Sequence, residues 1–295
     1  MNEKQILALG FFDGVHLGHV TLLQECVRLA QQNQCQAGVV TFGNHPDKLV
    51  MGTAPGLINT LADRERLLRQ NGIENIIVFP FDRKLKDMPW RDFISMLMEK
   101  HNAVGFVCGE DFHFGQYGQG RAEKLRQACA ELDIPCSVVP QQRLEGVVVS
   151  STHIRHLMET GHMSKAVNFL GHPHILTGKV VHGHQLGRRL GIPTANLMLP
   201  KELVVPKFGV YACIAVVGDQ RYCAVTNIGT RPTVAGIGIT VEPWILDYEG
   251  DLYDQEITLE FYQFLRPEQK FSTLEAMRQE IFRNAEEARE ILKTR

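Results

Sequence analysis

The sequence predicts a two-domain protein, in which an α/β domain built on a parallel sheet precedes a small antiparallel β-barrel with a C-terminal helix. Its 295 residues suffice for two domains of roughly 150 residues, each with its own core. The first half alternates short apolar runs with helical patterns, which is typical of a parallel sheet with crossover helices. The second half carries closely spaced strand patterns broken by Gly, Pro and Asn, which indicate a barrel. We place the boundary between residues 171 and 172.

The first half contains five strand-like runs and six helical patterns. The strands are expected at 5–11, 36–42, 75–81, 103–109 and 135–140. The helices are expected at 18–32, 63–71, 89–101, 120–132, 151–159 and 163–170. In the first helix, apolar residues recur at i, i+3, i+4 and i+7, which predicts one face that packs on the sheet. These residues are Leu22, Leu23, Cys26, Val27 and Ala30.

The second half contains five strand patterns and a long final helix. The strands are expected at 175–181, 209–217, 222–228, 239–246 and 256–265, and the helix at 272–293. We expect this helix to be amphipathic, with one apolar side. That side would comprise Leu274, Met277, Ile281, Ala285, Ala288 and Leu292.

Composition favours an ordinary cytoplasmic protein. Apolar residues make up 44%, charged residues 22%, and the net charge is −2, so no strong field would attract nucleic acid or an anionic membrane. No apolar run approaches the roughly 18 residues of a membrane span. The seven cysteines include no Cys-x-x-Cys pair and fall mostly in apolar runs, so we expect reduced, buried thiols.

The segment "GFFDGVHLGH", residues 10–19, follows the first predicted strand and leads into the first helix. His16 and His19 would therefore lie at a helix N-terminus, above the carboxyl ends of a parallel sheet, where backbone N–H groups and the helix dipole favour anions. Zinc would need further ligands, and the nearby sequence arranges none. We rank phosphate above metal, and two polar loop histidines remain an alternative.

The segment "VVVSSTHIRHL", residues 147–157, offers a second group of phosphate-binding side chains. Ser151 and Thr152 open a helix, and Arg155 follows one turn later on the same face. Hydroxyl groups, N–H groups and a guanidinium are suited to phosphate oxygens. An ordinary helix N-cap is the alternative.

The segment "TGKVVHGHQLGRRLGIPTANL", residues 177–197, is rich in glycine but lacks the Gly-Lys-Ser/Thr of a P-loop. Thr194 and Asn196 supply two oxygen ligands two residues apart. Magnesium takes few protein oxygens and leaves the rest of its shell to waters and nucleotide phosphates. An edge strand with a polar turn is the alternative.

Together these motifs resemble a known family. In the first half these are "FDGVHLGH", "SSTHIR", "TFGNHP" (41–46) and "VCGEDFHFG" (107–115). In the second half they are "GRRLGIPTANL", "PKFGVYACI", "NIGTRPT" (227–233), "VEPWILDYEGDLY" (241–253) and "FLRPEQKF" (264–271). In this order they resemble the bifunctional prokaryotic riboflavin kinase/FAD synthetase family. In that family a Rossmann-like nucleotidylyltransferase domain precedes a riboflavin kinase barrel.

The resemblance implies that residues 1–171 transfer AMP from ATP to FMN, which gives FAD and pyrophosphate. His16 and His19 would be the catalytic residues that stabilise charge on the α-phosphate. The implied ATP contacts are Gly10, Phe11, Asp13, Gly14, Ser151, Thr152 and Arg155, of which the last three would hold the β- and γ-phosphates. The implied flavin contacts are Asp111, Phe112 and Gly115.

The resemblance also implies that residues 172–295 transfer a phosphoryl group from ATP to the terminal ribityl hydroxyl of riboflavin. Glu242 would be the base, while Thr194 and Asn196 would hold Mg²⁺ with ATP. The implied ATP contacts are Gly178, Gly183, Gly187 and Arg188, and the implied flavin contacts are Asn227 and Arg231. The partners would then be small molecules: ATP, riboflavin, FMN and FAD.

Six positions differ from the pattern that the resemblance implies. They are Asn44, His113, Arg121 and His153 in the first half, and Val234 and Trp244 in the second. Histidine is mostly neutral at pH 7, so His113 and His153 would bind phosphate less strongly than the arginines expected there. Two alternatives follow: a riboflavin kinase with a weak or silent first domain, and a flavin-binding regulator without turnover.

Overall fold

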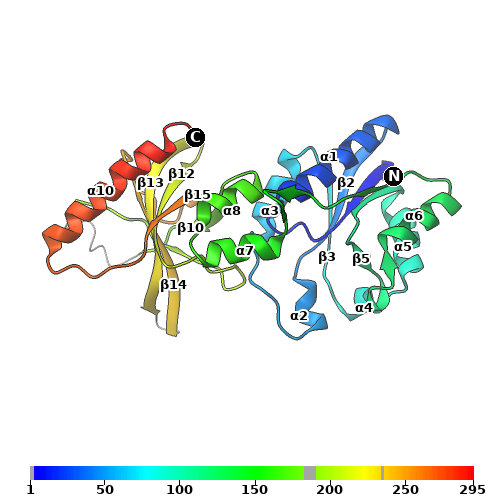
Figure 1. The fold of residues 1–295 in the computed structure, drawn as a ribbon, viewed down its shortest axis with the longest axis horizontal. Helices are drawn as coiled ribbons and strands as arrows, with labels where there is room; N and C mark the ends of the chain where they lie inside the picture. The colour runs from blue at the N-terminus through cyan, green and yellow to red at the C-terminus, as the bar shows by residue number, and fades with distance from the viewer. Residues whose placement is uncertain (1–2, 183–190, 234–235) are drawn as a thin grey trace. The chain divides into compact units, whose positions relative to one another are not determined.

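The computed structural model describes residues 3–182, 191–233 and 236–295, and within it the chain forms two compact units. The first comprises Met1–Leu57 and Leu61–Ser151, and the second comprises Ile58–Thr60 and Thr152–Arg295. Each unit has one of the two predicted architectures (Figure 1). The predicted domain boundary between residues 171 and 172 stays a prediction.

The first unit is built on a five-stranded parallel sheet, as the sequence predicted. Its strands are β1 (Gln5–Leu9), β2 (Gln36–Phe42), β3 (Asn75–Phe79), β4 (Ala103–Gly109) and β7 (Cys136–Val139). They lie in the order β3-β2-β1-β4-β7, so the chain reverses direction across the sheet between β1 and β4. Ligands of open α/β sheets bind at such a switch point, beyond the carboxyl ends of the strands.

Four longer helices pack around this sheet. They are α1 (Leu17–Gln32), α3 (Leu61–Gln70), α5 (Trp90–His101) and α6 (Ala122–Glu131). The predicted apolar face of α1 is confirmed, since Leu22, Leu23, Cys26 and Ala30 are buried and Val27 is half-buried. Residues of α5 and α6 form one core with Leu7 and Phe106 of the sheet.

Several short elements of the first unit were not predicted. They are α2 (Pro46–Val50), α4 (Arg83–Lys86), the 3₁₀ turn η1 (Gln116–Gly118), the ribbon β5 (His113–Phe114) with β6 (Gly120–Arg121), and the ribbon β8 (Arg143–Leu144) with β9 (Val147–Val148). Elements of two to five residues are too short to show a hydrophobic period, so the sequence gives no signal for them.

The second unit is a six-stranded antiparallel barrel that is nearly closed. Its strands are β10 (His174–Lys179), β11 (Leu197–Met198), β12 (Gly209–Val217), β13 (Gln220–Thr233), β14 (Gly236–Ile245) and β15 (Glu256–Arg266). The order is β10-β15-β12-β13-β14-β11. The two edges meet where Gly178 of β10 packs on Leu197 of β11, and a Cβ added at Gly178 would lie 2.9 Å from the Leu197 side chain.

The described residues of the barrel unit form three helices: α7 (Ser151–Glu159), which starts at the unit boundary, α8 (Met163–Leu170) and α10 (Leu274–Leu292). The long α10 packs on β12 and β13 through Ala285, Ala288 and Leu292, as predicted (Figure 1). The prediction for Leu274 was wrong, because this side chain is 68% exposed. Leu274 is the first residue of α10 and lies outside the core cluster that this helix forms with the barrel.

Candidate functional sites

The segment between β1 and α1 forms a tight loop at the switch point of the sheet. Phe12, Gly14 and Val15 have positive φ angles of 57°, 84° and 40°. Gly10 permits the turn, since a Cβ there would lie 3.0 Å from the Phe12 ring. Because the backbone turns back so sharply, the first turn of α1 lies directly beyond the strand, as a phosphate-binding loop requires.

His16 is the N-cap of α1, and its ring stacks on that of His19. The two ring centroids are 3.6 Å apart with an interplanar angle of 11°. The backbone N–H of His19 donates to Nδ1 of His16 at 3.3 Å, so a neutral His16 carries its proton on Nε2. The sequence prediction of two imidazoles at a helix N-terminus is confirmed.

The environment of His19 keeps its ring neutral. Burial is the largest cause that lowers the pKa of His19 well below its usual value, and the charges of His16 and Arg64 lower it further. A neutral imidazole still donates one N–H hydrogen bond, which is what a phosphate oxygen requires. Nδ1 of His19 is buried and has no hydrogen-bond partner among the described residues.

Two of the predicted ATP contacts adjoin this loop. Asp13 is 1% exposed, and its carbonyl accepts a hydrogen bond of 2.8 Å from the Ser151 hydroxyl. The structure therefore joins the two phosphate motifs, which are more than 130 residues apart in the sequence, through Ser151. Thr152 and Arg155 follow on α7 in the second unit, where Thr152 is exposed and Arg155 is buried.

A mostly apolar cavity of about 520 Å³ lies in the first unit. Its lining residues come from the ends of several elements: Phe42, Pro46, Val50, Phe81, Leu85, Lys86, Phe93, His113, Phe114, Gly115, Tyr117 and Gly118. Of the three predicted flavin contacts, only Gly115 lines it. Asp111 is exposed and accepts a hydrogen bond from Gln141, while Phe112 stacks on Phe114 at 5.4 Å.

Most residues of this cavity were missed by sequence reasoning. The aromatic ends of the second and third strand patterns, Phe42 and Phe81, are the signal that could have found them, since both follow apolar runs. His113, one of the six positions that differ from the family pattern, also lines the cavity. Its Nδ1 lies 2.7 Å from the Asp111 carbonyl oxygen. Asn44 exchanges two hydrogen bonds with the backbone of Phe81, which fixes the turn after β2.

In the barrel, a cavity of about 300 Å³ brings together three predicted site residues. Asn227 on β13 and Glu242 on β14 are direct cross-strand partners, and Thr194 lines the same cavity. Trp244, another position that differs from the family pattern, also lines this cavity and packs edge-on against Phe282 of α10. Sequence reasoning missed Arg266, which lines the cavity and bonds Asn284 of α10 at 2.9 Å.

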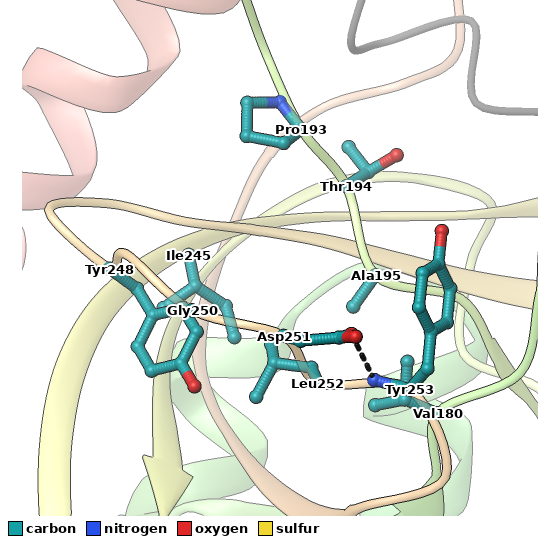
Figure 2. A pocket seen from close by; sticks show the side chains of 10 residues that line it. All are labelled: Val180, Pro193, Thr194, Ala195, Ile245, Tyr248, Gly250, Asp251, Leu252 and Tyr253. Atoms are coloured by element: carbon teal, nitrogen blue, oxygen red, sulfur yellow. Dashed lines mark hydrogen bonds between the residues drawn. The ribbon is translucent and has the colours of Figure 1, made fainter.

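Thr194 also borders a second, smaller cavity of about 80 Å³ (Figure 2). Its other lining residues are Val180, Pro193, Ala195, Ile245, Tyr248, Gly250, Asp251, Leu252 and Tyr253. The Asp251 carboxylate accepts the Tyr253 N–H at 2.9 Å, which fixes this loop, and the Tyr253 ring stacks on His182 at 3.9 Å. Tyr248 and Tyr253 lie on opposite sides of the pocket.

The remaining predicted residues fall into two groups. Asn196 is 9% exposed and lines neither barrel cavity, and Gly178 packs at the barrel seam. Gly183, Gly187, Arg188, Val234 and the side chain of Arg231 lie outside the described residues. Among the residues that the structure describes, no cluster of three or more His, Cys, Asp or Glu side chains could hold a metal. A magnesium that shares its shell with nucleotide phosphates needs no such cluster, and the hydroxyl oxygen of Thr194 and the amide oxygen of Asn196 are of the ligand type that it takes.

Two predictions from the sequence composition concern the cysteines and membrane-spanning segments. All seven cysteines are free thiols; four of them are buried as expected, and the other three are half-buried. None of the described helices is long and apolar enough to span a membrane.

The parallel-sheet unit contains a ligand-sized cavity and a stacked histidine pair, and the barrel contains a cavity that Glu242 lines, which is the arrangement expected of an enzyme with two separate sites. Comparisons with known proteins agree. Residues 1–153 match the FAD synthetase family model, and residues 170–292 match the riboflavin kinase model. The chain belongs to the family of bifunctional riboflavin kinase/FMN adenylyltransferases.

Individual relatives cover nearly the whole chain. The bifunctional riboflavin kinase/FMN adenylyltransferase of Escherichia coli strain K12 is 36% identical over 98% of this chain and 93% of its own. That of Bacillus subtilis strain 168 is 32% identical over 97% and 92%. A solved structure from Streptococcus pneumoniae, titled a macrolide-efflux protein, has a TM-score of 0.89 and 28% identity, and the match covers 98% of this chain and 95% of that one.

Proposed function

We propose that the first domain, residues 1–171, adenylylates FMN to FAD, and that the barrel domain, residues 172–295, phosphorylates riboflavin to FMN. The observation that carries this proposal is the convergence of Asn227, Glu242 and Thr194 on one barrel cavity, together with the stacked His16–His19 pair in the parallel-sheet unit. The two family models, which match different parts of the chain, support the same division. The product of the barrel is then the substrate of the first domain.

In the kinase reaction, the terminal ribityl oxygen of riboflavin attacks the γ-phosphorus of ATP and ADP leaves. Glu242 accepts the hydroxyl proton, and a positioned base contributes roughly 10²- to 10⁴-fold in rate. Asn227, opposite Glu242 on the neighbouring strand, orients the ribityl chain by hydrogen bonding. Arg231, in the same motif, serves as a second flavin contact.

Thr194 and Asn196 hold Mg²⁺, which neutralises phosphate charge when it is bound with ATP. Thr194 is placed for this role because it borders both barrel cavities. We assign the smaller cavity to the nucleotide and the larger to riboflavin, since the larger has more apolar lining and contains Glu242. As the resemblance implies, Gly178, Gly183, Gly187 and Arg188 also contact ATP.

In the adenylyl transfer, a phosphate oxygen of FMN attacks the α-phosphorus of ATP, and the bond to the β-phosphate oxygen breaks to release pyrophosphate. His16, His19 and N–H groups of the first turn of α1 donate hydrogen bonds to the crowded phosphates, and each such donor is worth about 3 to 4 kcal/mol in the transition state. Ser151, Thr152 and Arg155 bind the leaving phosphates. Gly10, Phe11, Asp13 and Gly14 shape the loop.

We assign the cavity of about 520 Å³ to the flavin ring of FMN. Flat aromatic side chains at its wall, such as Phe42 and Phe114, suit an isoalloxazine ring, since offset and edge-on aromatic contacts are favourable. Because Gly115 has no side chain, this part of the cavity wall can pack directly against Trp90. Asp111 and Phe112, which do not line this cavity, hold its β4 side in place.

One incubation tests the proposal: the chain with riboflavin, ATP and Mg²⁺, with FMN and FAD resolved by chromatography. We expect both products, with FMN appearing first. FMN alone would instead support a kinase with a silent first domain. Flavin binding without either product would support a non-catalytic regulator. The reduced thiols and low net charge support a cytoplasmic enzyme whose partners are small molecules.

A further inference from the structure

Arg64 is a fully buried cation that the reactions described above do not use. It lies on α3, and its side chain is 0% exposed. Its Nε and Nη2 atoms have no hydrogen-bond partner among the described residues. A buried charge without a hydrogen-bonded ion pair costs several kcal/mol, so packing alone would favour an apolar side chain here.

The third nitrogen of Arg64, Nη1, is hydrogen-bonded and contacts the loop between β1 and α1. Nη1 donates to the Phe11 carbonyl at 2.7 Å, and the Thr41 hydroxyl donates to the same oxygen at 2.8 Å. The guanidinium carbon also lies 4.7 Å from the centre of the Phe11 ring. Phe11 is therefore held by α3 and β2 together, at the point where the chain leaves β1.

The charge of Arg64 also acts on His19. Burial lowers the pKa of Arg64, while the charges of Asp13 and Glu65 raise it. The charges that act on His19 are those of His16 and Arg64, and both oppose its protonation. Two stacked rings 3.6 Å apart would repel one another if both were charged, so a neutral His19 also preserves the stack.

We propose that Arg64 is a positioning residue for adenylyl transfer: its guanidinium holds the Phe11 carbonyl, and its fixed positive charge acts on His19. The inference rests on the assignment of this pair to FAD formation. A neutral His19 keeps one N–H group that can donate to a phosphate oxygen.

Three variants separate the charge from the packing. Arg64→Met removes the charge and every donor, Arg64→Gln removes the charge but keeps an N–H donor, and Arg64→Lys keeps the charge. Arg69→Met, at an exposed arginine on the same helix that bonds the Glu74 carbonyl, is the matched control. The histidine titrations of the ligand-free chain are followed by NMR of ¹³C-labelled rings, with the His19 signal assigned by its absence in His19→Ala.

We expect the His19 midpoint to rise by roughly half a pH unit, about a threefold change in protonation, in Arg64→Met and Arg64→Gln. It should stay unchanged in Arg64→Lys and Arg69→Met. The acid limb of the pH profile of FAD formation from FMN should shift upwards by the same amount, while FMN formation from riboflavin stays unchanged. Arg64→Gln keeps the measurement available if Arg64→Met fails to fold.

An unmoved His19 midpoint, with FAD formation reduced equally at every pH, would overturn the inference and leave Arg64 as a packing residue. Full FAD formation in all three variants would overturn it as well. Failure of the underlying assignment gives a different result, because His19→Ala would then form FAD at the wild-type rate.

Discussion

Asn227 and Glu242 are directly opposed on the antiparallel strands β13 and β14, and both line the larger barrel cavity. Directly opposed residues point to the same face of a sheet, with Cβ atoms about 5 Å apart. An amide and a carboxylate therefore face one small volume, where a substrate hydroxyl can contact both.

Replacing Glu242 with Gln should reduce FMN formation by roughly 10²- to 10⁴-fold, because the amide cannot accept the ribityl proton. FAD formation from supplied FMN should remain at the wild-type rate. Steady-state assays of the two half-reactions check this. Glu256→Gln, at an exposed carboxylate of β15, is the control and should leave both rates unchanged. Retained kinase activity in Glu242→Gln would remove Glu242 from the role of base.

Replacing His19 with Ala should reduce FAD formation by about 10²- to 10³-fold, because one donor to the reacting phosphate is lost. FMN formation should be unaffected. Measuring FAD from FMN and ATP tests the first statement, and measuring FMN from riboflavin tests the second. His156→Ala removes an exposed imidazole of α7 and serves as the control. Equal loss of both activities in His19→Ala would contradict the division of labour.

The buried His174 of β10 should make the barrel less stable in acid. Burial is the main cause that lowers the pKa of His174 to about 3, and the charge of His172 adds to it. The folded barrel keeps this ring neutral while the unfolded chain protonates it near pH 6.5, so stability is full above that pH. It is lost as the pH falls from 6.5 towards 3.

Between pH 7 and pH 5 this loss should amount to about 2 kcal/mol. Urea unfolding followed by Trp244 fluorescence measures it, in a Trp90→Phe background that leaves the tryptophan of the barrel as the only one. His174→Gln should remove most of the pH dependence whatever its effect at pH 7. An unchanged dependence in that variant would assign the effect to other groups.

Substituting Gly115 with Ala should damage the flavin cavity more than backbone strain alone explains. Gly115 has a φ of +70°, and an added Cβ would lie 2.6 Å from backbone and side-chain carbons of Trp90. Gly52 has a φ of +79° with nothing within 4 Å, so Gly52→Ala isolates the strain. We expect Gly115→Ala to lose roughly 1 to 3 kcal/mol more stability than Gly52→Ala, as overpacked sites do.

Gly115→Ala should also raise KM for FMN in FAD formation, while KM for riboflavin in the kinase reaction stays the same. Thermal unfolding and the two KM values are the measurements. Equal stability of the two alanine variants would show that the Gly115 turn can move away from Trp90.

Strong periodicity made the long elements predictable. The alternation of apolar runs and helical patterns gave the parallel sheet, and the face of α1 follows directly from the i, i+3, i+4 spacing of Leu22, Leu23 and Cys26. Leu274 shows the limit of this reasoning, because a helical pattern does not tell where the partner surface stops. Its turn of α10 has the right period but no core beside it.

The phosphate motifs were predictable because each is contiguous in the sequence. The flavin cavity was not, since Phe42, Phe81 and Tyr117 meet only after three strands and two short helical segments have taken their places. Gly178 was predicted to contact ATP, and the structure gives it a packing reason as well, namely the Leu197 side chain at the barrel seam. The local sequence contains the glycine but does not show which neighbouring group leaves no room for a side chain.

The seam at Gly178 and Leu197 has a consequence for self-association. The edge strand of a sheet has unpaired N–H and C=O groups that can pair with a strand of another chain. Folded proteins avoid such edge-to-edge pairing. Here the two rim strands of the barrel turn towards one another, and one of them, β11, is only two residues long. A bulky residue at position 178 would press on the Leu197 side chain at this rim, so we expect such a variant to aggregate more readily than the wild type.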